Sequence, residues 1–356
     1  MVTKLKLGKI NGGVQQVMKV GVVGFGYWGP NIVRNLQASA DFDLVAIADR
    51  SDEARRKISR LYPGLEVLED ADDLIVRQDI EAVVIVTPVA THFPIGRKAL
   101  LAGKHVLIEK PLCTSVAEAE ELVAIAKCGQ RTLMVDHTFL FSGPVQTIRQ
   151  VAAGGGLGKI CYFDSIRVNL GLFQPDVNVL WDLAPHDLSI ICALRDDEIV
   201  GVEATGYCHV NAMLPDMAYV TIHFADDAVA HLNLSWMSPV KVRRFAIGGT
   251  DRMLIWDDLD QDQKIRIYSS GIEFQPETDR STIIPDYRIG DIYSPRVPRN
   301  EALAGVVGHF ANVINGSEAS IMDGRAGLRV VRILEDAQQK LDVSLRDLQA
   351  KRKDRR

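Results

Sequence analysis

Short apolar runs alternate with amphipathic stretches of helical spacing from residue 19 to residue 137. The run at 83–86 is apolar at every position, which is typical of a strand covered on both faces. Strands that alternate with helices in this way predict an α/β domain with a doubly wound parallel sheet. We expect strands at 19–24, 42–49, 66–68, 82–87, 105–109 and 132–136, and helices at 28–38, 52–61, 70–77, 93–102 and 116–128.

The pattern changes after the glycine-rich turn at 154–156. Later segments mostly alternate apolar and polar residues, which predicts an α+β domain with a mostly antiparallel, open-faced sheet. We expect Val229, Leu232 and Leu234 to lie on a face that packs on another subunit, giving a homodimer or homotetramer. We expect strands at 160–169, 199–210, 217–224, 228–237, 242–248 and 253–256, helices at 144–152, 180–194, 300–315 and 323–341, and a long excursion or loop at 260–298.

Composition and charge exclude several classes of protein. The chain has 356 residues, enough for two domains, and a net charge of −5 that offers no basic surface for nucleic acid. No apolar run approaches the roughly 18 residues of a membrane span. Five cysteines without a Cys-x-x-Cys motif are typical of reduced thiols in a cytoplasmic protein. The remaining histidines suggest no metal site.

A glycine motif, Gly24-Phe25-Gly26-Tyr27-Trp28-Gly29, lies between the first expected strand and the first expected helix. Gly24 permits a tight turn, Gly26 lets a pyrophosphate approach the backbone, and Gly29 lets the helix pack closely on the strand. The N-terminus of the helix then faces the phosphate charge. The motif therefore predicts a dinucleotide site formed by these six residues.

An acidic residue, Asp49, follows the second expected strand, twenty residues after Gly29. A carboxylate at this distance accepts hydrogen bonds from the ribose hydroxyls of the adenosine and repels a 2′-phosphate. Arg50 beside it could stack on adenine or hold such a phosphate. We favour NAD over NADP because Asp49 would repel the 2′-phosphate of NADP.

Three further motifs complete a resemblance to a known family. They are Thr87-Pro88 followed by His92, Glu109-Lys110-Pro111, and Trp181-Asp182-Leu183-Ala184-Pro185-His186-Asp187. With the glycine motif, they resemble the Gfo/Idh/MocA family, the glucose–fructose oxidoreductase and inositol dehydrogenase group, over residues 19 to about 340. The resemblance implies a Rossmann domain and adds Thr87, Pro88, His92, Glu109 and Lys110 to the expected cofactor site.

The resemblance also implies a catalytic set. Lys110 would be an active-site residue that hydrogen-bonds a sugar hydroxyl, with Pro111 in a cis bond aiming it inward. Asp182 and His186 are four residues apart, so they share one face of a helix. His186 would move the hydroxyl proton, and Asp182 would orient the ring or contact the substrate.

Other polar residues are candidate substrate contacts. Asn169, Asp176 and Asn178 precede the helix that carries Asp182, and each is equally consistent with a turn role. His137 follows the sixth strand, where many family members carry arginine, and it is a second possible sugar contact.

The motifs divide the chain and indicate its function. We expect an N-terminal extension (1–18), an NAD-binding domain (19–137), a substrate-binding and oligomerisation domain (138–345) and a charged tail (346–356). The leading hypothesis is an NAD-dependent oxidoreductase that moves hydride between nicotinamide and a sugar carbinol or ketone, with a nucleotide-linked or amino sugar as substrate. The alternatives are an NADP-dependent sugar ketoreductase, an inositol-type dehydrogenase, and a regulatory sensor that binds NAD without turnover.

Overall fold

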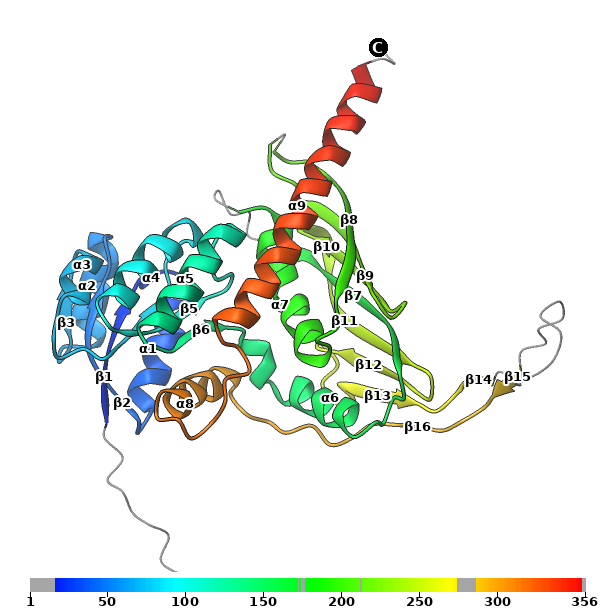
Figure 1. Cartoon of the computed structure of the whole chain (residues 1–356), viewed down its shortest axis with the longest axis horizontal. Helices are drawn as coiled ribbons and strands as arrows, with labels where there is room; N and C mark the ends of the chain where they lie inside the picture. Colours follow the sequence, from blue (N-terminus) through cyan, green and yellow to red (C-terminus); the bar gives the residue numbers. More distant parts are fainter. Residues whose placement is uncertain (1–16, 172, 174–176, 212, 274–285, 354–356) are drawn as a thin grey trace, which may run out of the picture.

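Two large sheets with helices packed around and between them form most of the described part of the molecule, which also has a small two-stranded sheet (Figure 1). The computed structural model describes residues 17–171, 173, 177–211, 213–273 and 286–353. Strands and helices alternate in the first part of the chain, as predicted. The elements are β1 (Met18–Val23), α1 (Gly29–Ala38), β2 (Phe42–Ala48), α2 (Asp52–Leu61), β3 (Glu66–Leu68), α3 (Ala71–Ile75), β4 (Ala82–Ile85), η1 (Val89–Thr91), α4 (His92–Leu101), β5 (His105–Glu109), α5 (Val116–Cys128) and β6 (Leu133–Asp136).

The first sheet has the order β3-β2-β1-β4-β5-β6, and its neighbouring strands pair in parallel. Strand β4 is buried at every position, as its uninterrupted apolar sequence predicted. Side chains of α1 and α2 belong to one hydrophobic core, and those of α3, α4 and α5 belong to another, so both faces of the sheet are covered. The doubly wound prediction is confirmed, and the carboxyl ends of the strands carry the glycine motif and Lys110.

The second part of the chain forms a mixed sheet with the order β16-β13-β12-β11-β7-β10-β9-β8. Strands β7 and β10 run parallel, and the other neighbours are antiparallel, as expected of this half. The elements are η2 (Thr138–Phe141), α6 (Gly143–Ala153), β7 (Ile160–Leu170), α7 (Val179–Leu194), β8 (Ile199–Tyr207), β9 (Met217–Phe224), β10 (Val229–Ser235), β11 (Met237–Gly249), β12 (Met253–Asp257), α8 (Ala302–Ile314) and α9 (Gly324–Lys353).

Two expectations about the end of the chain were wrong. The stretch 260–298 is not one loop, because it contains β13 (Ile265–Tyr268), β14 (Gly271–Glu273), β15 (Asp286–Arg288) and β16 (Ile292–Tyr293), while 274–285 lie outside the described residues. The alternating pattern of β13, with Ile265 and Ile267 buried, is too short to be distinctive between polar flanks. Helix α9 continues past residue 341 to Lys353 and projects beyond the rest of the molecule (Figure 1), since its charged residues are good helix formers.

The orientation of β10 also differs from the expectation. Leu232 and Leu234 are fully buried within the chain, in the core shared with α7. Side chains alternate along a strand, so the opposite, partly exposed face carries Val229, His231 and Asn233. The two leucines therefore stabilise the subunit itself and are unavailable to another one.

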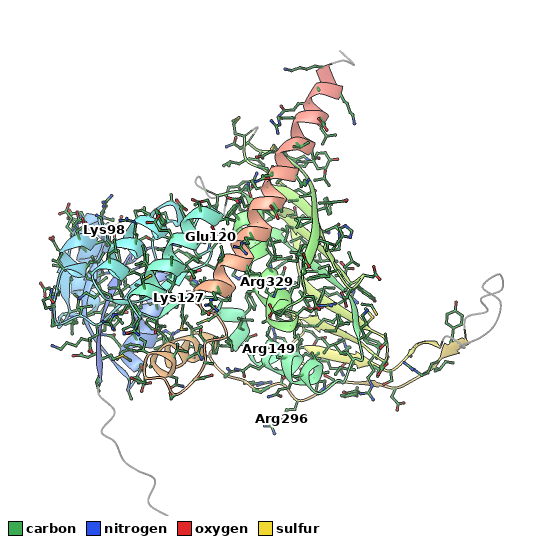
Figure 2. The ribbon with its side chains drawn as sticks, viewed as in Figure 1. Lys98, Glu120, Lys127, Arg149, Arg296 and Arg329 are labelled. Atoms are coloured by element: carbon green, nitrogen blue, oxygen red, sulfur yellow. The ribbon has the colours of Figure 1, made fainter. Side chains whose placement is uncertain are left out.

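Long-range polar contacts hold the two halves together. Arg34 and Asn35 of α1 contact Glu301, which immediately precedes α8. Glu120 of α5 lies beside α9 (Figure 2) and accepts a hydrogen bond from Arg332 at 2.6 Å. Arg329 of α9 donates to the backbone at the end of α7. Helix α9 thus touches both domains and fixes α7 relative to the first sheet.

Candidate active site

The glycine motif has the backbone geometry that a dinucleotide site requires. Gly24 has φ of +100°, and a Cβ there would lie 2.5 Å from the carbonyl oxygen of Val86. A Cβ on Gly29 would lie 2.9 Å from the carbonyl oxygen of Gly24, so α1 packs against the loop only through glycine. A Cβ on Gly26 would meet nothing within 4 Å, which leaves open space at the N-terminus of α1. These three residues fit a bound pyrophosphate.

We expect Gly24→Ala to destabilise the protein by more than about 1 kcal/mol and to weaken NAD binding, because alanine neither tolerates the positive φ nor clears Val86. Urea unfolding and NAD titration measure the two effects. Gly64→Ala is the matched control, since a Cβ there meets nothing within 4 Å. Equal unfolding free energies for the two variants would contradict the assigned role of Gly24.

Asp49 lies against this loop. Its Oδ2 accepts a hydrogen bond from the backbone N–H of Phe25 at 2.6 Å, and its Oδ1 accepts one from Ser51 at 2.8 Å. The carboxylate thus braces the glycine loop and places its negative charge where the adenosine ribose is expected. The Phe25 side chain is buried in the core, so only its backbone is available to a cofactor, whereas Tyr27 and Arg50 are exposed. Trp28 stacks on Tyr27 with ring centroids 6.2 Å apart.

His92 connects two loops of the site. Its Nδ1 lies 2.8 Å from the carbonyl oxygen of Pro111, and its Nε2 lies 2.8 Å from that of Thr87. The side chain is buried. Both ring nitrogens thus lie against the backbone, which supports a positioning role for His92, and its expected cofactor contact stays a prediction. His92 fixes the Thr87-Pro88 turn relative to the loop that carries Lys110.

Lys110 and Asp182 meet across 72 residues of sequence. The Lys110–Pro111 bond is cis, and Lys110 Nζ donates to the carbonyl oxygen of Asp182 at 2.9 Å and to its Oδ1 at 3.1 Å. The other carboxylate oxygen of Asp182 accepts from Trp236 Nε1 at 3.1 Å. The contact joins the end of β5 to the first turn of α7. Both residues were predicted from their motifs, whereas Trp236 lies outside every motif that marked the site.

His186 lies one turn after Asp182 and beside these charges. Its ring packs edge-on against Phe139 at 5.1 Å between centroids. Burial lowers the pKa of His186 well below that of a free histidine, and the positive charge of Lys110 lowers it further. The ring is therefore neutral at physiological pH, so it can accept a proton.

A buried ion pair that no sequence motif predicted lies next to Phe139, the ring that packs against His186. Arg167 Nη2 is 2.6 Å from Asp187 Oδ1, and Ser165 Oγ donates to Asp187 Oδ2 at 2.8 Å. The Arg167 guanidinium lies over the ring of Phe139, 4.9 Å from its centroid. Asp187 thus faces the second sheet, and it anchors an arginine below the ring that contacts His186.

The other expected substrate contacts fall into different environments. His137 is buried, and neither ring nitrogen has a hydrogen-bond partner. Asn169 is partly exposed, and its side chain donates to the carbonyl oxygen of Leu170. Asn178 caps α7, with Oδ1 accepting from Leu180 and Trp181, and its amide donates to Gln338. This geometry supports the structural role for Asn178, and its sugar contact stays a prediction. Asp176 lies outside the described residues.

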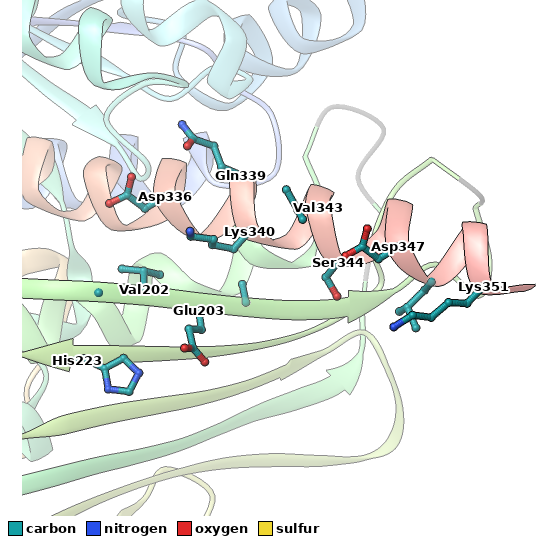
Figure 3. A pocket seen from close by; sticks show the side chains of 13 residues that line it. Val202, Glu203, His223, Asp336, Gln339, Lys340, Val343, Ser344, Asp347 and Lys351 are labelled. Atoms are coloured by element: carbon teal, nitrogen blue, oxygen red, sulfur yellow. The ribbon is translucent and has the colours of Figure 1, made fainter.

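A separate surface groove lies away from these residues. A groove of ≈ 790 Å³ runs between the second half of α9 and β8 (Figure 3), and its lining includes Glu203, His223, Lys340 and Asp347. None of the lining residues belongs to the Lys110–Asp182 site. We place the chemistry at Lys110 because buried, convergent polar groups are found there, and the groove is an open, charged surface.

Two other features, a metal site and a membrane-spanning helix, are absent from the residues that the structure describes. Among the residues that the structure describes, no three histidine, cysteine or acidic side chains come together as a metal site. None of the helices in the described ranges is both long and apolar enough to cross a membrane.

Comparisons with known proteins agree with this geometry. Residues 18–137 match the model of the GFO_IDH_MocA oxidoreductase family with an NAD-binding Rossmann fold, and residues 145–255 match the GFO/IDH/MocA C-terminal domain. The chain is 29% identical over 322 residues to a UDP-N-acetylglucosamine 3-dehydrogenase from Acidithiobacillus ferrooxidans, covering 88% of this chain and 94% of that protein.

Two further similarities are informative. A crystal structure of the Acidithiobacillus ferrooxidans UDP-N-acetylglucosamine 3-dehydrogenase superposes with a TM-score of 0.78 at 27% identity, covering 92% of this chain and 99% of that one. A dTDP-3,4-didehydro-2,6-dideoxy-alpha-D-glucose 3-reductase from Streptomyces violaceoruber is 34% identical over 123 residues, 35% of this chain and 36% of that protein. The matched domains, the glycine loop and the placement of Lys110 lead to one conclusion: this chain is an oxidoreductase of the Gfo/Idh/MocA family, and its N-terminal domain is an NAD-binding Rossmann domain.

Proposed function

We propose that the chain is an NAD-dependent dehydrogenase or reductase of a nucleotide-linked sugar. The observation that carries this proposal is the contact of Lys110 with Asp182 beside a neutral His186, at the carboxyl end of β5. Ligands bind beyond the strand ends of such sheets. The substrate class rests on the name of the Acidithiobacillus ferrooxidans relative, which spans most of this chain.

Each residue has a distinct part in this chemistry. Bound NAD would supply or accept the hydride. Lys110 would donate a hydrogen bond to the substrate oxygen, where negative charge develops. Asp182 holds the Lys110 ammonium in place and is itself held by Trp236. His186 would take the hydroxyl proton during oxidation and return it during reduction.

The pKa of His186 has a consequence for pH dependence. Because that pKa is lowered, the neutral ring persists to lower pH than a free histidine allows. The acidic limb attributable to His186 in sugar oxidation should therefore lie well below the usual histidine range.

The environment of Asp49 supports NAD over NADP. Its carboxylate accepts hydrogen bonds from the loop and from the start of α2, so its negative charge is fixed beside the expected ribose. A 2′-phosphate placed there would meet this charge. The alternative function, an NADP-dependent ketoreductase, would require the positive charge of the exposed Arg50 to offset the repulsion between Asp49 and the 2′-phosphate.

The proposal is tested by nicotinamide absorbance. Purified protein with NAD should oxidise UDP-N-acetylglucosamine or a related nucleotide sugar far faster than free N-acetylglucosamine or myo-inositol. Faster turnover of myo-inositol would support the inositol-type alternative, and tighter binding of NADP than NAD would support the ketoreductase. NAD binding without turnover across a broad sugar panel would support a sensor.

We also propose that the subunits form a homodimer or homotetramer. The partly exposed face of the second sheet, including Tyr162, Tyr219 and His231, supports this proposal. Light scattering that gives a monomer would contradict it.

A further inference from the structure

Two acidic side chains face each other behind Lys110. Glu109 and Asp136 are register partners at the carboxyl ends of the parallel strands β5 and β6. Register partners on neighbouring parallel strands project their side chains from the same face of the sheet, so the two carboxyl groups are neighbours. Asp136 is 1% exposed, and its Oδ1 accepts from Thr138 at 2.7 Å. Glu109 Oε2 and Asp136 Oδ2 are both buried and have no hydrogen-bond partner. One buried oxygen of each carboxyl group therefore has no hydrogen-bond donor.

We propose that Glu109 and Asp136 share a single proton at neutral pH, and that the pair positions Lys110 by presenting one negative charge behind its ammonium. A shared proton supplies the missing donor for both buried oxygens at once. Two adjacent carboxylates would repel each other in a buried site, whereas two neutral carboxyls would leave the ammonium with less countercharge. The pair thus acts through Lys110, and this role depends on the function proposed above for that lysine.

The environment of the pair agrees with this arrangement. Burial raises the pKa of Glu109 well above its usual range, and the charge of Asp136 raises it further. Burial raises the pKa of Asp136 to about 6, against the opposing effect of Thr138. Burial thus favours keeping a proton in the pair, whereas the positive charge of Lys110 favours keeping one of the two carboxyls ionised.

The neighbouring titratable groups come from several elements. Lys110 and Asp182 influence the pair directly, and the pKa of His137, next to Asp136, is lowered to about 3 by burial, which leaves that ring neutral. Asp323, in the segment that bridges to β6, uses its carboxylate to accept from the backbone of Ala326. The cation that acts on both carboxyls is Lys110, the residue that follows Glu109 in the chain.

The first test detects the proton itself. Infrared spectra of the purified full chain at pH 7 should contain a carbonyl stretch from a protonated carboxyl. Glu109→Gln should remove this signal, because the glutamine amide replaces the protonated carboxyl and Asp136 stays charged. Asp79→Asn is the matched control: the Arg77 hydrogen bond lowers the pKa of Asp79 to about 2, so its carboxyl is already ionised. Absence of the signal in the parent protein, or its persistence in Glu109→Gln, would overturn the shared proton.

The second test detects the charge behind Lys110 without any substrate. Acetic anhydride labels neutral amines, and mass spectrometry reports the labelling of Lys110 relative to the exposed Lys98 in the same sample. The double variant Glu109→Gln/Asp136→Asn removes the charge, so Lys110 should give up its proton more readily and label about tenfold faster. A rate ratio unchanged from the parent would overturn the positioning role.

The two tests separate this inference from the proposed function. Neither requires sugar turnover, so an inactive protein on the sugar panel would leave both results interpretable. The infrared test needs only the single variant, which replaces a protonated carboxyl by an amide of similar shape. The assignment of the proton is therefore decided even where the double variant does not fold.

Discussion

Replacement of Lys110 by methionine is expected to lower kcat by about 10²–10⁴-fold, the usual contribution of a positioned proton-transfer or oxyanion-stabilising group. Methionine retains an unbranched apolar side chain and removes the donor that contacts Asp182 Oδ1 at 3.1 Å. The glycine loop and Asp49 are unchanged, so the variant should still bind NAD, and any rise in Kd should be small beside the loss in kcat. Initial rates on the best substrate of the sugar panel, together with an NAD titration, measure both quantities.

Lys98→Met provides the matched control for this experiment. Lys98 is exposed on α4, pairs with Asp72 at 2.6 Å and, within the described part of the chain, makes no hydrogen bond or ion pair with Lys110, Asp182 or His186. We expect its kcat to equal that of the parent. A Lys110→Met enzyme that loses less than about tenfold in kcat would exclude Lys110 from the chemical step.

Asp187→Ala is expected to reduce the free energy of unfolding by about 3–5 kcal/mol, because it leaves the buried Arg167 guanidinium without its counter-ion. The Arg167 and Asp187 side chains are only 4% and 2% exposed. Ser165 loses its acceptor as well. Urea unfolding followed by fluorescence measures the loss. The relaxed guanidinium should also disturb Phe139 and His186, so activity should fall in the protein that remains folded.

Two comparisons make this prediction specific. Glu121→Ala breaks an exposed pair with Arg97 at 2.6 Å, and surface pairs contribute only about 0–1 kcal/mol. The double variant Arg167→Met/Asp187→Leu removes both charges, so it should lose less stability than Asp187→Ala alone. If Asp187→Ala is as stable as Glu121→Ala, water must reach the Arg167–Asp187 pair.

Features that depend on local backbone or on neighbouring residues were predictable. The glycine motif requires a positive φ at Gly24 and close packing at Gly29, and both requirements appear in the sequence as missing side chains. The apolar run of β4 reports its burial on both faces because every residue of such a strand meets a helix layer. The spacing of Asp182 and His186 places them on one side of α7 for the same local reason.

Partners chosen over long distances were not predictable. Asn178 could cap a helix or bind a sugar, and the fold supports the cap by bringing Gln338 of α9 to its amide. Leu232 and Leu234 would suit either face of a sheet, and the position of α7 determined which face is the core. The short strands after residue 260 pair with β12 and with one another, so their hydrogen bonds come from the sheet and their own sequence signals are weak.

The sequence by itself determined the Rossmann half of this protein, its glycine loop, and the presence of Lys110, Asp182 and His186. These follow from periodicity and from the steric needs of single residues, which act over a few positions of the chain. Only the tertiary structure decided that Lys110 is held by Asp182 and Trp236, that Glu109 faces Asp136, and that Arg167 is buried on Asp187. Charge and hydrogen bonding act through space, so their partners are fixed only when distant strands and helices pack together.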